Sequence, residues 1–203
     1  MTLDRLPSVI ANTRFNAAGL AETKEGLLVP AYVASQLGFS TIGKVQLNAL
    51  HDRLREEAGV LPLCPFTACA EYLDFSRLGA AHTIDDVLGF WDEFNRLLGP
   101  VNYDELMPRS KFMIAILDGG HAVDDGVATE IGFYAGRYQG EKPILGIRSD
   151  FRLAENPAAP INPAIRYFLD QGPFNGQFFH GAEAYDRAVD AAKDLAARIR
   201  ASE

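Results

Sequence analysis

The sequence predicts a doubly wound α/β fold, with a parallel sheet of about five strands and helices on both faces. Short apolar runs alternate with amphipathic segments along the chain. The segment 111–120 contains a continuous apolar run and ends in glycines, which is typical of a strand buried on both faces. Alternating strands and helices favour a parallel sheet, and right-handed crossovers then place helices on both of its faces.

The first half of the chain is expected to supply two strands and two long helices. Residues 1–26 are interpreted as an extension that packs on the domain or on a partner subunit, so the α/β domain is expected to span 27–203. Pro30 favours an edge position or a strand start. In order, we expect a strand at 27–34, an amphipathic helix at 41–58, a strand at 60–66, an irregular stretch at 67–83 and a helix at 84–98.

The second half continues the alternation. We expect a short helix at 104–109, a strand at 111–120, a helix at 124–139, a strand at 142–147, a helix at 165–169, a strand at 177–181 and a helix at 182–201. Ligands of such sheets bind at the carboxyl ends of the strands. The loops at this edge are 35–40, 118–125 and 149–162.

Composition excludes several classes of protein. The 203 residues carry a net charge of -8, so the basic footprint of a nucleic-acid-binding protein is missing. No apolar run approaches the roughly 20 residues that span a bilayer, and the start has no signal-peptide pattern, so we expect a cytoplasmic protein. Cys64 and Cys69 are too few for a disulfide framework or a zinc site.

The loop after the third strand carries the most informative residues, in LDGGHAVDDGVATEIGFYAG. Asp124 or Asp125 is placed to cap a helix, and Gly126 allows a close backbone approach. Glu130 lies one to two turns into that helix, among apolar residues. It could decorate the helix, or it could act as a base or nucleophile beside a ligand.

Other candidates each have a structural alternative. Asp104 could pair with Glu130 in acid/base or glycosyl chemistry, or it could cap residues 105–109. Gln36 could reach a ligand or bind backbone, and His121 could contact a base or be a solvated loop residue.

Four segments together resemble the nucleoside 2'-deoxyribosyltransferase family, whose members have a flavodoxin-like sheet. YVASQLGFS (32–40) resembles the family's first strand and loop, and DDGVATEIGFYAG (124–136) resembles its Asp-x-Gly-x-x-x-Glu-x-Gly signature. Asp104 precedes the signature glutamate by 26 residues, the interval typical of the family's leaving-group acid, and PINPAI (160–165) resembles a segment that reaches a neighbouring subunit's site. The family's glutamine after the second strand has no counterpart here.

The resemblance implies roles for individual residues. Glu130 is expected to be the nucleophile, Tyr32 to orient it, and Asp104 to protonate the departing base. Asp124 and Asn162 are expected to hold the sugar 5'-hydroxyl, with Asn162 arriving from another chain of a homo-oligomer.

The implied activity is transfer of 2'-deoxyribose between free nucleobases, by double displacement without metal or cofactor. A relative that cleaves nucleoside monophosphates resembles this family but has serine in place of Asp124. Since an anionic Asp repels a phosphate, the sequence favours nucleosides. The alternatives are an N-glycoside hydrolase on the same scaffold and a non-catalytic nucleoside-binding module.

Overall fold

The computed structural model describes residues 5–24, 26–120, 122–150 and 160–203. In this part of the chain seven strands form one sheet, in the order β1-β2-β3-β5-β6-β7 with β4 also paired to β3. They are β1 (Arg14–Phe15), β2 (Ala21–Thr23), β3 (Gly26–Ser35), β4 (Val60–Leu63), β5 (Phe112–Ile116), β6 (Ile144–Arg148) and β7 (Gln177–His180). The order β4-β3-β5-β6-β7 is parallel throughout and is that of a flavodoxin-like sheet. The predicted fold class is confirmed.

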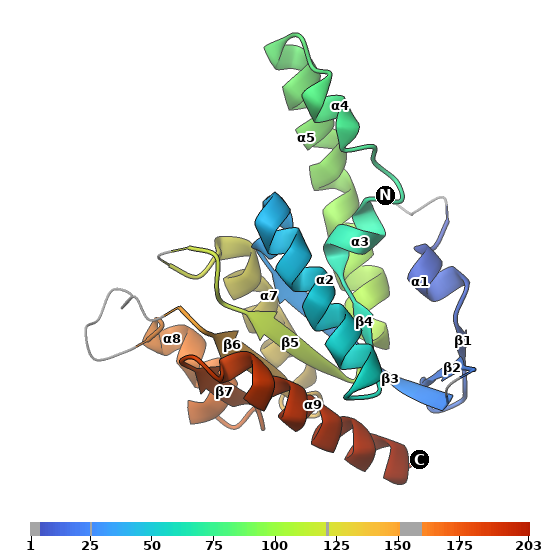
Figure 1. Ribbon diagram of the computed structural model, residues 1–203, viewed down its shortest axis with the longest axis vertical. Coiled ribbons are helices and arrows are strands. Elements are labelled where there is room, and N and C mark those ends of the chain that lie inside the picture. The colour runs from blue at the N-terminus through green and yellow to red at the C-terminus, as the bar shows by residue number, and fades with distance from the viewer. Residues whose placement is uncertain (1–4, 25, 121, 151–159) are drawn as a thin grey trace.

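Helices cover both faces of the sheet (Figure 1). The helical elements are α1 (Ser8–Ala11), η1 (Leu37–Phe39), α2 (Thr41–Glu56), α3 (Pro65–Cys69), α4 (Ser76–Gly79), α5 (Ile84–Gly99), η2 (Pro100–Leu106), α6 (Met107–Arg109), α7 (Asp125–Tyr138), α8 (Pro163–Arg166), η3 (Tyr167–Gln171) and α9 (Ala184–Ala201). Helices α2 and α9 pack on one face, and α7 packs on the other with part of α5. The upper part of α5 and the short α4 project beyond the sheet (Figure 1).

Strand alternation assigns side chains to the two layers. In β3, Val33 points into the layer of α2 and α9, whereas Tyr32 points into the layer of α7. In β5, Ile114 likewise points into the layer of α2 and α9, and Met113 points into the layer of α7. The position of Tyr32 within the sheet therefore sends its ring toward α7.

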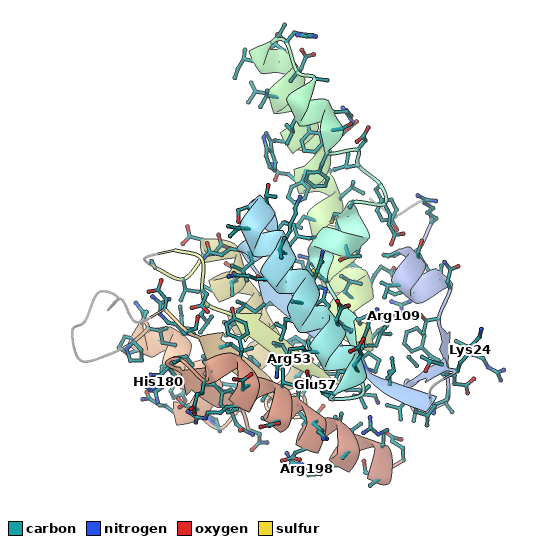
Figure 2. The ribbon with its side chains drawn as sticks, viewed as in Figure 1. Lys24, Arg53, Glu57, Arg109, His180 and Arg198 are labelled. Atoms are coloured by element: carbon teal, nitrogen blue, oxygen red, sulfur yellow. The ribbon has the colours of Figure 1, made fainter. Side chains whose placement is uncertain are left out.

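An ion-pair cluster links the two helices of the first layer. Arg53 near the end of α2 bonds Glu57 at 2.9 Å and Asp186 of α9 at 2.8 Å. Figure 2 shows Arg53 and Glu57 beside α9. Exposed pairs contribute roughly 0–1 kcal/mol, so this packing depends mainly on buried leucines of α2 and alanines of α9.

Three expectations need correction. Pro30 lies inside the central strand β3 and not at an edge; the ladder to β5 begins one residue later, at Ala31, so that ladder does not need the missing N–H. Residues 67–83 were expected to be irregular but include most of α3 and all of α4. The helix expected at 104–109 begins earlier, as the π-helix η2, so Asp104 lies within a helical segment and caps nothing.

The expected extension packs on the domain as a β-hairpin. Strand β2 pairs with the start of β3 in antiparallel register, Ala21 opposite Leu28, and β1 pairs with β2. Leu20 and Ala21 are buried there. Among the helices of the described residues, none combines the length and apolar character needed to cross a membrane.

Candidate active site

A tyrosine and a glutamate meet at the centre of the sheet, where its strand order reverses. The Tyr32 hydroxyl of β3 donates to Oε1 of Glu130 at 2.7 Å. Glu130 lies on the buried stripe of α7, between Val127 and Tyr134, so the helix presents a carboxylate where an apolar side chain is usual. The reversal between β3 and β5 is where ligands of this fold bind.

Burial dominates the electrostatics of Glu130. Its side chain is among the few buried charged groups, and burial, with the nearby Asp124 charge as a smaller cause, raises the pKa of this carboxyl to about 7. The hydrogen bonds from Tyr32 and Asn102 act in the opposite direction. Burial and the Glu130 charge raise the pKa of the Tyr32 phenol well above its usual value, so it remains a donor. Near neutral pH, Glu130 therefore exists in both protonation states.

Asn102 is the second donor to the glutamate. Its Nδ2 group donates to the same oxygen, Oε1, at 2.9 Å. Asn102 lies in the π-helix η2, where its carbonyl accepts the N–H of Met107, five residues on. Its own Oδ1 is buried and has no hydrogen-bond partner among the described residues.

A cavity of about 70 Å³ lies beside Glu130. Its polar lining comes from Ser35, Asn102, Asp124 and Glu130, together with the backbone of Gly126. The remaining walls are apolar, and they are formed by Phe39, Pro65, Phe66, Phe94, Leu98 and Val127. The polar groups can hold the reacting part of a ligand, and the apolar walls suit a flat ring.

Asp124 serves the helix and the cavity together. Its carboxylate accepts the N–H of Val127 at 3.1 Å as the N-cap of α7, and it also lines the cavity. A Cβ atom on Gly126 would lie 2.9 Å from Oδ1 of Asp124. Glycine at this position therefore leaves the room that the Asp124 carboxylate occupies.

The other predicted site residues lie outside this cavity. Gln36 donates to the carbonyl of Asp118 at 3.0 Å, which is the backbone role considered for it. Asp104 is exposed on η2 and does not line the cavity. Asn162 caps α8 by accepting the N–H of Ala164 at 2.9 Å. His121 and most of the loop at 149–162 lie outside the described residues.

Sequence reasoning missed Asn102 and the aromatic walls. Asn102 lies 28 residues before Glu130 and two before Asp104. Its only signal was a polar residue two positions after the Gly99-Pro100 pair, at the end of an apolar helix. Phe39 and Phe66 pack edge to face, with centroids 4.8 Å apart, although they follow different strands.

A carboxylate with one oxygen held by two donors is suited to act as a nucleophile or a base. Within the described residues, no three His, Cys, Asp or Glu side chains gather as a metal-binding group. Neither a protein-family model nor a curated protein sequence matches the chain. Function is therefore inferred from the geometry of the site and from the motifs of the sequence.

Proposed function

We propose that this protein transfers 2'-deoxyribose between nucleobases through a covalent intermediate on Glu130. The observation that carries the proposal is the buried hydrogen bond from Tyr32 to Glu130, at 2.7 Å, beside a cavity that Glu130 and Asp124 both line. These three residues are those to which the family resemblance gives the nucleophile, its orienting hydroxyl and the sugar contact. The surroundings of Glu130 support this role because a merely structural carboxylate is seldom buried without a positive partner.

The reaction is a double displacement. An oxygen of ionised Glu130 attacks the anomeric carbon, the bond to the base nitrogen breaks, and its electron pair leaves with the base, which takes up a proton. A second base attacks the same carbon from the opposite side, releases the Glu130 carboxylate and loses a proton. Two inversions retain the anomeric configuration. Asp104 is assigned as the proton donor in this scheme; it is exposed on the turn of η2 that also carries Asn102, so it reaches the base only when the cavity opens.

The substrate proposed is a nucleoside with a free 5'-hydroxyl. The Asp124 carboxylate is half-buried at the cavity, where it can accept a hydrogen bond from a hydroxyl but repels a phosphate. The apolar walls suit the face of a base, and their aromatic groups are Phe39, Phe66 and Phe94. Since pockets for such ligands span roughly 300–1,000 Å³, binding requires the walls of this cavity to open.

Asn162 is assigned to the site of a neighbouring copy. Asn162 caps α8 and does not line the cavity beside the Glu130 of its own chain, so a role in the site requires it to come from another copy. The protein is accordingly proposed to be a homo-oligomer with shared sites.

The test is a chromatographic assay with 2'-deoxyinosine and free adenine, and a parallel sample without adenine. We expect 2'-deoxyadenosine in the first sample only, and none with Glu130→Gln, which keeps the size of the side chain. Free deoxyribose and hypoxanthine in both samples would replace transfer with hydrolysis. No product from purine or pyrimidine donors would refute both enzymatic readings and leave the binding module.

A further inference from the structure

We propose that Asn102 is a positioning residue for Glu130: its amide and the Tyr32 hydroxyl hold one carboxylate oxygen, and the other oxygen is left to react. Both hydrogen bonds described for this carboxylate go to Oε1, at 2.7 Å from Tyr32 and 2.9 Å from Asn102. The two donors come from different elements: Tyr32 from the strand β3 and Asn102 from the π-helix η2. Together they fix the rotation of the carboxylate and thereby the direction of Oε2.

An irregular helical turn, the π-helix η2, carries Asn102 to its contact with Glu130. Pro100 begins η2, and its missing N–H and fixed ring disfavour continuation of the regular helix α5. The wider π turn rotates the residues that follow, and turns of this kind are frequent at functional sites. Asn102 is 1% exposed as a result, whereas Asp104 on the same turn is exposed.

The amide of Asn102 is costly to the fold. Oδ1 has no partner among the described residues, and a buried acceptor without a hydrogen bond destabilises the folded state. A leucine of similar size would avoid that cost. The amide is therefore better explained by its single contact with Glu130 than by stability. The inference rests on the proposed function for the reaction, but the contact can be tested without substrate.

The first measurement is the titration of Glu130, by NMR of protein labelled with ¹³C at the glutamate carboxyl. The signal is assigned by its loss in Glu130→Gln. We expect a midpoint near the pKa of about 7 in the wild type. In Asn102→Leu it should rise by roughly one unit, because a donor to the charged form is lost. Asn95→Leu, on the exposed side of α5, should leave it unchanged.

The second measurement is the pH profile of transfer. At pH 7, Asn102→Leu should be about fivefold slower in kcat, because the ionised fraction falls from about one half to about one tenth. The loss should largely disappear near pH 9, with KM little changed. A uniform loss at every pH, together with an unchanged Glu130 midpoint, would indicate a structural role and overturn the proposal.

Asn102→Asp keeps the fold testable if the leucine variant does not fold. Two carboxyl groups would then share one site, so the Glu130 midpoint should rise further than in Asn102→Leu. A midpoint within about 0.3 units of wild type in the folded variants would overturn the positioning role, even with transfer intact. A shifted midpoint without transfer in any protein would refute the proposed function and leave the positioning role standing.

Discussion

Replacing Glu130 by glutamine should stabilise the protein above neutral pH. The pKa of this carboxyl is raised from 4.5 to about 7 in the folded state, so the folded protein binds the proton more tightly than the unfolded chain. A raised pKa contributes stability below the unfolded value, and that contribution is lost as pH rises through the folded value. A difference of about 2.5 units corresponds to about 3 kcal/mol.

Urea unfolding of both proteins between pH 4 and pH 9 measures this difference. The variant and the wild type should be about equally stable near pH 4. The gap should then open by about 1.4 kcal/mol per pH unit and level off near pH 7, at about 3 kcal/mol. Glu56→Gln on the exposed face of α2 is the control and should follow the wild type. A constant gap across this range would refute the burial argument for Glu130.

The remaining predictions concern the cavity and the assembly. Tyr32→Phe removes the 2.7 Å hydrogen bond, so the Glu130 pKa should rise by roughly 1–2 units and transfer at pH 7 should fall roughly 5- to 50-fold, with recovery in alkaline buffer. Asp124→Ser keeps an N-cap, so the free energy of unfolding should change by less than about 0.5 kcal/mol. The ratio of kcat/KM for 5'-monophosphates to kcat/KM for nucleosides should rise roughly tenfold. An unchanged ratio would mean that Asp124 does not exclude a phosphate. Gly126→Ala gains about 1 kcal/mol of helix propensity, but its Cβ displaces the Asp124 carboxylate that caps α7, so Tm should change little. Because that carboxylate is proposed to contact the sugar, KM should rise several-fold. An unaltered KM would mean that Asp124 does not touch the substrate. Dilution to monomers should abolish transfer if Asn162 acts in trans, and sedimentation run beside the assay decides this; fully active monomers would contradict it.

The sequence was sufficient for the fold class because its strongest signals are local. The apolar run that became β5 and the amphipathic periods of α2 and α5 need no knowledge of their neighbours. The loops at the carboxyl edge followed from the topology, and they led to Asp124 and Glu130. Both residues line the cavity beside α7.

The parts that failed depend on pairing and packing. From the sequence alone, Pro30 favours an edge position because proline has no backbone N–H to donate. The pairing of β3 with β5 begins only at Ala31, so that donor is not needed at Pro30. The π turn at 100–106 departs from the regular helical period, and Asn102 bonds Glu130 in the layer where α5 and α7 share one hydrophobic cluster. The exposed position of Asp104 has the same origin, because spacing along the chain does not give direction on an irregular turn.

The Tyr32–Glu130–Asn102 contact also makes inactivation an all-or-none event. Its three members come from the central strand, the π turn and α7, and they span about half of the chain. Central strands usually open only with the whole domain, whereas termini and edges open alone. The hairpin of β1 and β2 can therefore fray without disturbing the glutamate, and loss of activity in denaturant should coincide with global unfolding.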